Sequence, residues 1–212
     1  MKALVIGAAG HTGMVLVDKL LQDSDYTCVV VFVNRSTGKK HTKFREYIVN
    51  LSDIDSYRKD VVGDVLFFCF ETAINGVAIR EHQWKSDIEI LNGFIMLACE
   101  NGVNSFILES SLNASSNSWV HYFRMKGILE EMIAEFYFEQ YVIFKPGLII
   151  KERTSWIKEK IIVNTLRVFN AMGMFEEFRP LSASLLAEKL VKAPKVLPSG
   201  TSVIKFERIF TL

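Results

Sequence analysis

The sequence predicts an α/β fold, a doubly wound parallel sheet covered by helices on both faces. Short apolar runs rich in β-branched residues alternate with longer stretches that have helical periodicity. The apolar runs are continuous, which is typical of parallel strands buried on both faces. With 212 residues, 50% of them hydrophobic and 23% charged, the chain has the size and composition of one globular domain.

Apolar runs in the first part of the chain predict the strands, of which the third is weak: Lys2–Ile6, Thr27–Val33, Tyr47–Val49, Val65–Phe70, Phe106–Leu108 and Tyr141–Phe144. Amphipathic stretches between them predict the helices: His11–Leu21, Glu81–Glu100 and Ser118–Phe136. Because crossovers between parallel strands are right-handed, the simplest assembly of these elements is a doubly wound sheet.

The alternation weakens after Pro146. Residues Ser155–Met172 and Ser182–Lys192 predict helices, and Thr201–Phe206 predicts a short strand. We therefore expect one domain over residues 1–212, in which residues 151–212 form a small C-terminal helical extension. Ligands of doubly wound folds lie beyond the carboxyl ends of the strands. The extension is thus a candidate wall of the substrate site or, equally well, a cover for the core.

Composition argues against several functions. The net charge of +1 speaks against a dedicated nucleic-acid-binding protein, because phosphate contacts require a clustered basic excess. The longest apolar runs, such as Cys28–Val33, are far shorter than a membrane span of about 20 residues. The four histidines are scattered, and none pairs with a cysteine at ligand spacing, so we expect no metal site. All three cysteines lie in apolar segments, which predicts reduced thiols and a cytoplasmic location.

The first predicted strand leads directly into Gly7-Ala8-Ala9-Gly10-His11-Thr12-Gly13, and a predicted helix follows. Glycine allows a tight turn and lets the backbone approach a pyrophosphate, while the helix N-terminus offers unpaired N–H groups. This context is typical of the dinucleotide-binding loop of Rossmann-type folds. We expect the cofactor to contact Gly7, Gly10, His11, Thr12 and Gly13. The alternative is a tight strand-to-helix turn that binds no ligand.

The end of the second strand predicts which dinucleotide binds. An acidic residue there would bind a ribose 2′-hydroxyl, whereas arginine accommodates a 2′-phosphate. The chain has Arg35 and Ser36 at this place and no carboxylate, and three lysines follow by residue 43. We therefore predict NADP(H) rather than NAD(H), the alternative being a solvated basic turn.

The glycine loop, Arg35, the segment Tyr122-Phe123-Arg124-Met125-Lys126 and the segment Phe144-Lys145-Pro146-Gly147 together resemble the atypical short-chain dehydrogenase/reductases. Over roughly residues 1–195 the chain is most similar to the NAD(P)-binding NmrA-like group, in particular to the Tat-interacting-protein-like oxidoreductases. The resemblance implies that Tyr122 is the acid/base, that Lys126 holds the nicotinamide ribose, and that Ser110 or Ser111 orients a substrate carbonyl. Independently, a lysine at i+4 shares a helix face with the tyrosine and can stabilise a phenolate whose ordinary pKa is about 10.

Some positions depart from the family pattern. Asn50 and Leu51 stand where relatives often place an aspartate against the adenine, and Cys69 leads into Glu71 where a small residue would face the nicotinamide. Asp87 lies about where extended relatives carry an asparagine. We expect Asn50, Leu51, Cys69 and Pro146 to line the cofactor, and Glu71 to crowd it.

Two functions remain open. The first is an NADP(H)-dependent oxidoreductase acting on a small carbonyl or alcohol, which Tyr122 and Lys126 favour. The second is a non-enzymatic NADP(H)-binding regulator, which Glu71 and the short tail favour. A sugar-nucleotide epimerase is a weaker alternative, because the region after Pro146 is small. The expected partner is a small-molecule substrate. The apolar stripe within residues 161–169 could face a second copy in a homodimer or belong to the core.

Overall fold

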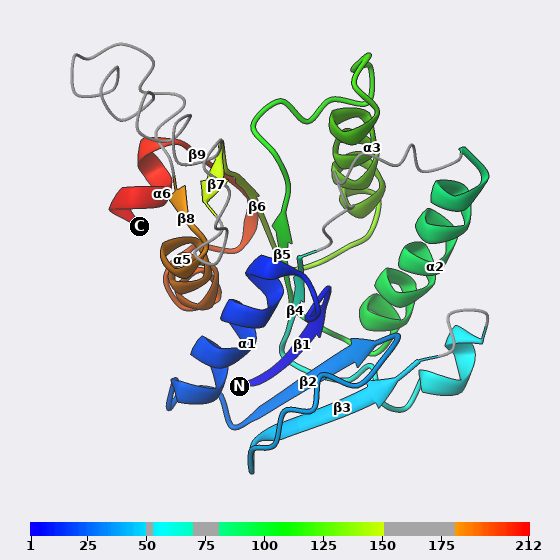
Figure 1. The fold of residues 1–212 in the computed structure, drawn as a ribbon, viewed down its shortest axis with the longest axis vertical. Helices are drawn as coiled ribbons and strands as arrows, with labels where there is room; N and C mark the ends of the chain where they lie inside the picture. Colours follow the sequence, from blue (N-terminus) through cyan, green and yellow to red (C-terminus); the bar gives the residue numbers. More distant parts are fainter. Residues whose placement is uncertain (50–52, 70–80, 151–180) are drawn as a thin grey trace.

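The computed structural model describes residues 1–49, 53–69, 81–150 and 181–212. At its centre is a seven-stranded sheet, entirely parallel, in the order β3-β2-β1-β4-β5-β6-β9 (Figure 1). The strands are β1 (Lys2–Ile6), β2 (Cys28–Val33), β3 (Phe44–Ile48), β4 (Val65–Phe68), β5 (Ser105–Glu109), β6 (Gln140–Lys145) and β9 (Gly200–Lys205). The order of the first six strands is that of a Rossmann fold, which confirms the predicted fold class.

Helices cover both faces of the sheet (Figure 1). One face packs against α1 (His11–Gln22) and α5 (Ala183–Val196), and the other against α2 (Glu81–Glu100) and α3 (His121–Ala134). The remaining elements are the 3-10 helix η1 (Ile54–Tyr57), the two-stranded sheet of β7 (Ile149–Ile150) and β8 (Leu181–Ser182), and α6 (Glu207–Thr211). No helix in the described parts of the chain combines the length and apolarity needed to span a membrane.

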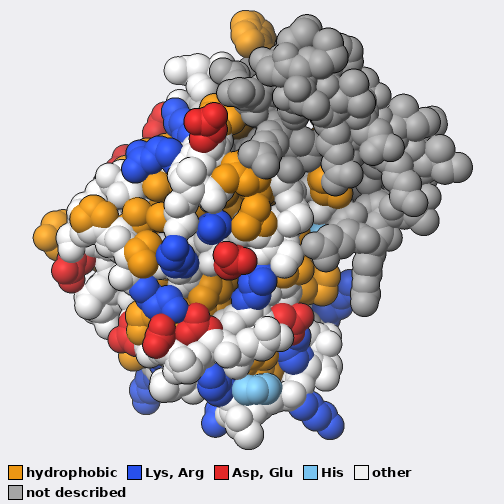
Figure 2. All heavy atoms as spheres, turned by 90° about the vertical axis from the view of Figure 1, so that its left-hand side faces the viewer, with side chains coloured by type: hydrophobic (Ala, Val, Ile, Leu, Met, Phe, Trp, Pro, Cys, Tyr) orange, Lys and Arg blue, Asp and Glu red, His pale blue; other side chains and the backbone are white. Residues whose placement is uncertain are grey.

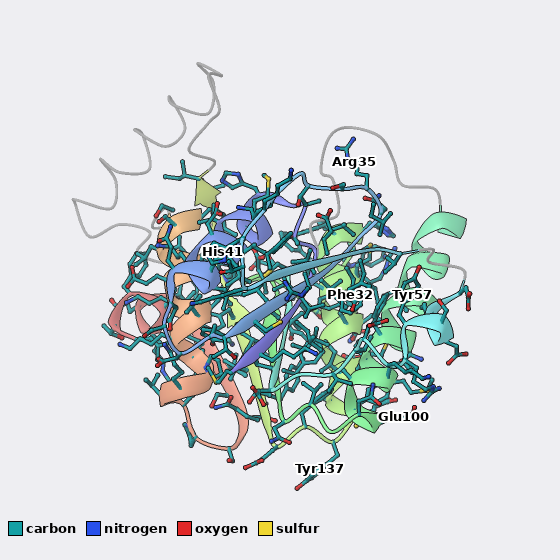
Figure 3. All side chains as sticks on the ribbon, turned by 90° about the horizontal axis from the view of Figure 1, so that it is seen from below. Phe32, Arg35, His41, Tyr57, Glu100 and Tyr137 are labelled. Atoms are coloured by element: carbon teal, nitrogen blue, oxygen red, sulfur yellow. The ribbon has the colours of Figure 1, made fainter. Side chains whose placement is uncertain are left out.

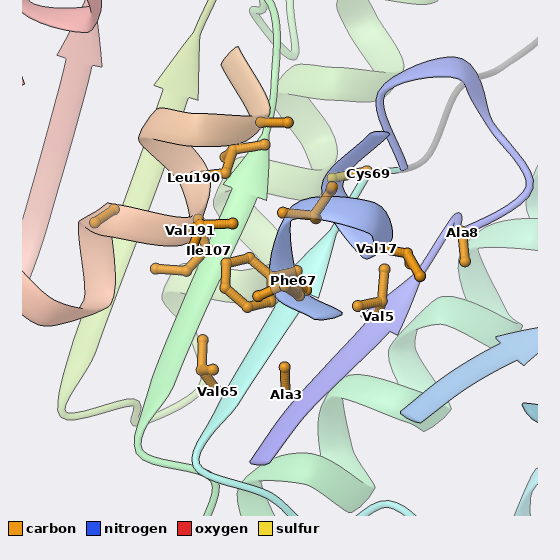
Figure 4. Close-up of a cluster of buried hydrophobic side chains, with 14 of the residues drawn as sticks. Ala3, Val5, Ala8, Val17, Val65, Phe67, Cys69, Ile107, Leu190 and Val191 are labelled. Carbon is orange, nitrogen blue, oxygen red and sulfur yellow. The ribbon is translucent and has the colours of Figure 1, made fainter. Parts of the chain in front are cut away.

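The core lies in two clusters, one on each face, because neighbouring residues of a strand point to opposite sides. On the α1 side, Val5, Phe67 and Ile107 belong to one buried cluster with Leu190 of α5 (Figure 4). The intervening strand residues belong to the cluster under α2 and α3. Phe67 has no exposed surface, and burying such a side chain contributes about 1.5–3 kcal/mol.

The last part of the chain contributes to this core. Helix α5 begins after Ser182, whose hydroxyl accepts a hydrogen bond from the Leu185 N–H at 3.1 Å. The Tyr26 hydroxyl donates to the Val191 carbonyl at 2.9 Å, which ties α5 to the start of β2. Strand β9, expected as a short strand over Thr201–Phe206, pairs in parallel with β6 and extends the sheet. The helix expected over Ser155–Met172 lies outside the described residues.

The third strand differs from the expectation. It was expected over Tyr47–Val49 and runs over Phe44–Ile48, pairing with β2 along its whole length. Its charged residues Arg45 and Glu46 conceal the apolar pattern, because β3 is an edge strand with one side open to water.

The crossover from β2 to β3, residues 34–43, contains no helix. It is held against α1 by an ion pair between Lys39 and Asp18, and by a hydrogen bond from the Lys43 ammonium to the Asp23 carbonyl at 2.9 Å. Positive and negative side chains are interspersed on the face of the molecule that Figure 2 shows.

Candidate functional site

The glycine loop between β1 and α1 is the first component of the site. Gly7 has a φ of +85°, a left-handed conformation that favours glycine. The Gly10 N–H donates to the Gly7 carbonyl at 2.9 Å and closes the turn. A Cβ at Gly13 would stand 2.1 Å from the Gly7 carbonyl oxygen, so only glycine permits this approach of helix and loop.

The loop fits a pyrophosphate. Gly10 is the N-cap of α1 and has no side chain to satisfy the N–H groups of the first turn. Those N–H groups and the positive end of the helix dipole are what a phosphate requires. The Nε2 atom of His11, the first residue of α1, is buried and has no hydrogen-bond partner among the described residues. A polar ligand at this turn would find an unsatisfied group there.

Thr12 faces the sheet. Its hydroxyl donates to the Glu109 carboxylate at 2.9 Å, and the two side chains are almost completely buried. Thr12 therefore ties α1 to the carboxyl end of β5. Sequence reasoning missed Glu109, because nothing in the pattern Ser105–Glu109 indicates a partner that lies 97 positions away in the sequence.

Lys126 reaches the same place from α3. Its side chain is buried, with 3% of the residue exposed, and its ammonium donates to the Glu109 carbonyl at 2.7 Å. A buried ammonium is stable only where acceptors or negative charges compensate for lost water. The end of β5 thus brings together α1 and α3, the two helices that carry most of the expected site.

The two candidate serines follow β5 and differ in their bonding. Ser110 is buried, and its hydroxyl donates to the Glu130 carboxylate. Ser111 is also buried, but its hydroxyl has no hydrogen-bond partner among the described residues. Because the hydrogen of Ser110 is engaged by Glu130, Ser111 is the serine that can donate to a ligand.

Glu130 is the centre of a second polar cluster that sequence reasoning missed. Its carboxylate forms an ion pair with Lys145 at 2.6 Å, and the two side chains are only 14% and 12% exposed. The Tyr141 hydroxyl donates to the Glu130 carbonyl at 3.3 Å. Burial, together with the negative charge of Glu130, raises the pKa of Tyr141. The available signal was the spacing of Glu130, which lies one turn beyond Lys126 on α3.

Tyr122 lies in the first turn of α3 and is partly exposed. Its ring packs against Phe123 at a centroid distance of 5.4 Å, and its spacing places it on the same helix face as Lys126. The serine-containing loop crosses α3 very closely at Gly127, where a Cβ would stand 2.2 Å from the Ser116 nitrogen. Gly127 therefore allows the loop after Ser111 to lie beside the helix.

Only some of the residues expected near the adenosine lie in the described part of the chain. Arg35 is exposed at the end of β2 and makes no ion pair or hydrogen bond within the described residues (Figure 3). The Ser36 hydroxyl donates to the Glu46 carboxylate at 2.5 Å. Asn50, Leu51 and Glu71 lie outside the described residues, as does the side chain of Asp87.

Two further expected contacts lie at strand ends. Cys69 is buried after β4, and its N–H donates to the Ile6 carbonyl at 3.0 Å. The Pro146 carbonyl, after β6, accepts from the Leu112 N–H at 3.0 Å. Both residues thus stand at the carboxyl edge of the sheet, where ligands of this fold bind.

Comparison with known proteins identifies relatives for most of the chain, although no family model matches it. It is 29% identical over 171 residues to "Protein FMP52, mitochondrial" of Eremothecium gossypii, covering 80% of this chain and 75% of that protein. It is 27% identical over 219 residues to the protein of the same name in Meyerozyma guilliermondii, covering 97% and 94%. It is 24% identical over 164 residues to "Protein HTATIP2" of Rattus norvegicus, covering 74% and 68%.

Solved structures share the fold. The Bordetella bronchiseptica enzyme WbmH, in complex with NAD+, superposes with a TM-score of 0.68 at 15% identity, covering 96% of this chain and 75% of that one. A UDP-glucose 4-epimerase of Thermotoga maritima, with UDP-glucose, gives 0.67 at 20% identity, covering 96% and 76%. At such low identity the likeness concerns the fold alone.

The names of the fungal relatives contradict the cytoplasmic location expected from the cysteines. Several of these relatives are named as mitochondrial proteins. The three cysteines are indeed free thiols. Free thiols indicate a reducing environment but do not identify the compartment, so the inference from cysteine to cytoplasm was wrong.

Proposed function

We propose that this chain, which belongs to the atypical short-chain dehydrogenase/reductases of NmrA-like type, is an NADP(H)-dependent oxidoreductase acting on a small carbonyl or alcohol. The observation that carries the proposal is the position of Lys126. A buried ammonium stands at the carboxyl end of β5, 2.7 Å from the Glu109 carbonyl, beside Ser110 and Ser111. The glycine loop is tied to the same point through Thr12 and Glu109.

The proposed roles follow from this arrangement. The N–H groups after Gly10 would bind the pyrophosphate, and Arg35 the 2′-phosphate. A bound dihydronicotinamide would supply the hydride to the carbonyl carbon. Tyr122 would donate its phenolic proton to the carbonyl oxygen, and the Lys126 charge would stabilise the resulting phenolate. Ser111, whose hydroxyl is available, would donate a hydrogen bond to the carbonyl oxygen and orient the substrate.

The proposed cofactor class has support from the fold and from the loop. Structural neighbours are described in complex with NAD or NAD+, and the glycine turn at the start of α1 has no capping side chain to compete with a pyrophosphate. The preference for NADP(H) rests on Arg35 and on the absence of a carboxylate directly after β2. Given the names of its fungal relatives, we also propose that the protein acts in mitochondria.

The proposal is tested by fluorescence titration with NADPH and NADH, followed by a screen of aldehydes, ketones and quinones. NADPH should bind more tightly than NADH, and at least one carbonyl class should be reduced with oxidation of NADPH. Arg35→Ala should weaken NADPH binding about tenfold or more, as expected for the loss of a charge-assisted contact. It should leave NADH binding nearly unchanged. Failure of the wild type to bind either dinucleotide would refute the proposal.

A second candidate is a regulator that binds NADP(H) without turnover. The observation that favours a regulator is that polar groups of the candidate site are already hydrogen-bonded to other groups of the protein. Ser110 is bonded to Glu130, and the Lys126 ammonium is bonded to the Glu109 carbonyl. Tight NADPH binding without turnover of any compound in the screen would favour this function over the first.

A further inference from the structure

The turn that follows β2 is held by one carboxylate. Glu46 lies on β3 opposite Val31 of β2, and its strand neighbour Phe44 belongs to the buried cluster on the α1 face. Since side chains alternate along a strand, Glu46 is on that same face, where the crossover of residues 34–43 runs back towards β3.

The contacts of Glu46 form a clamp on residues 36–38. One carboxylate oxygen accepts from the Ser36 hydroxyl at 2.5 Å. The other accepts from the Thr37 N–H at 2.9 Å and from the Thr37 hydroxyl at 2.5 Å. The Ser36 oxygen in turn accepts from the Gly38 N–H at 3.1 Å. Two consecutive residues are thus bonded directly to the Glu46 side chain, and Gly38 is bonded to the first of them.

The Glu46 carboxylate is ionised at neutral pH. Burial alone would raise the pKa of Glu46, but the hydrogen bonds from Ser36 and Thr37 outweigh it and lower the pKa below its ordinary value. Hydrogen bonds to an ionised acceptor are stronger than those to a neutral one. The crossover has no helix to define its path, so these bonds and the Lys39–Asp18 ion pair set its course.

Arg35 is the residue between the end of β2 and the clamp. It is exposed and makes no ion pair within the described residues, so its own side chain does not fix its place (Figure 3). The Ser36 hydroxyl hydrogen is engaged by Glu46 and cannot be donated to a phosphate at the same time. Of the two residues expected to meet a 2′-phosphate, Arg35 is therefore the one whose side chain is available, and its position depends on the turn.

We infer that Glu46 is a positioning residue for cofactor selection, which holds the turn so that Arg35 meets the 2′-phosphate of the adenosine. This inference rests on the proposed NADP(H) binding. The positioning role and simple charge repulsion predict opposite changes in affinity when Glu46 is replaced. A carboxylate near a phosphate repels it, so removing the charge would tighten binding if Glu46 acted by its field alone. Removing the clamp should instead weaken binding.

The experiment uses the full chain and calorimetric titration with adenosine 2′,5′-bisphosphate and with 5′-AMP. These probes differ in the 2′-phosphate and involve no turnover. We compare wild type, Glu46→Gln, Glu46→Ala, Arg35→Ala and the double variant Arg35→Ala/Glu46→Ala. The ionic strength is about 0.15 M, so that distant charges are screened. Glu100→Gln is the matched control, because it removes another carboxylate, which is bonded to the exposed Arg58 and lies far from Arg35 (Figure 3).

Glu46→Ala should weaken bisphosphate binding about twofold to tenfold, the cost of ordering one long side chain. Glu46→Gln should have a smaller effect in the same direction, because its amide oxygen still accepts. Binding of 5′-AMP should not change, and Glu100→Gln should behave as wild type. In the double variant, Glu46→Ala should add nothing to the loss caused by Arg35→Ala.

The outcomes separate this inference from the proposed function. If Arg35→Ala leaves bisphosphate binding unchanged, the proposed 2′-phosphate site is wrong. If Arg35→Ala weakens it but neither Glu46 variant does, or if Glu46→Gln tightens it, the positioning role is refuted. Equal losses for the bisphosphate and 5′-AMP would also refute it, since Glu46 would then support the whole adenosine site. Circular dichroism of each variant verifies that the fold is intact.

Discussion

Replacing Gly13 by alanine tests the geometry of the glycine loop. The added Cβ would stand 2.1 Å from the Gly7 carbonyl oxygen and 3.0 Å from the Ala8 Cα. The loop would have to move by about 1 Å to restore an ordinary contact, and such overpacking costs about 1–3 kcal/mol. Alanine gains about 1 kcal/mol in helix propensity over glycine within α1. Because the crowded atoms belong to the backbone, the cost should lie at the upper end of that range, and the net loss of stability should be about 2 kcal/mol.

Gly13→Ala should also weaken cofactor binding. A shift of the turn misplaces the N–H groups that would bind the pyrophosphate, and each charge-assisted hydrogen bond lost costs about 1.5–3 kcal/mol. NADPH and NADH should both bind at least about tenfold more weakly. Fluorescence titration measures the affinities, and thermal unfolding measures the stability.

A matched control is Gly102→Ala. Gly102 has a φ of +73° and open space around its Cα, and it precedes β5 at the amino-terminal edge of the sheet, away from the loop. Its substitution should cost about 1–2 kcal/mol of stability through backbone strain and leave cofactor affinity unchanged. If Gly13→Ala folds and binds both dinucleotides as wild type does, the loop is not the pyrophosphate site.

Two further predictions concern ion pairs. Burial alone would raise the pKa of Asp23, but hydrogen bonds, first that from Lys195, outweigh it and lower the pKa. The ionised Asp23 therefore stabilises the folded state at pH values above the ordinary pKa of 3.8, and this contribution is lost as pH falls through the lowered pKa. Lys195→Met should therefore cost about 0.5–1 kcal/mol in urea unfolding at pH 7, and a loss of the same size in strong acid would contradict this. Glu130→Gln should destabilise by about 2 kcal/mol or more, because it leaves the Lys145 ammonium, 12% exposed, without its charge partner. The Glu100 carboxylate is 46% exposed, so Glu100→Gln should cost less than about 1 kcal/mol of stability. Equal losses of stability for the two glutamate variants would refute the argument that burial sets the cost of losing the charge.

Local patterns in the sequence predicted the central sheet and its helices well. Continuous apolar runs are sufficient for buried strands such as β2, and the glycine spacing is sufficient for the turn before α1. The edge strand β3 was placed too late, because Arg45 and Glu46 interrupt its apolar pattern. The strand pair β7 and β8 was missed, because two residues are too few to form a pattern.

The polar contacts of the site could not be predicted from local patterns. Glu109 lies one residue beyond the predicted strand Phe106–Leu108, and its role depends on Thr12, which is distant in sequence. Ser110 and Ser111 were indistinguishable, because only the position of Glu130 on α3 shows which hydroxyl is engaged. Such pairings depend on how the helices pack on the sheet, and a single sequence does not contain that information in readable form.

The central claim, that α3 carries an acid/base pair beside a bound dinucleotide, is tested most directly by two variants measured together. With a substrate from the carbonyl screen, Tyr122→Phe should lower turnover by about 10²–10⁴, the range for general acid–base catalysis, with almost no change in NADPH affinity. Lys126→Ala should lower both turnover and NADPH affinity, because the lysine is proposed to contact the cofactor as well as stabilise the phenolate. Wild-type turnover in Tyr122→Phe, or an equal loss of NADPH binding in both variants, would contradict the account.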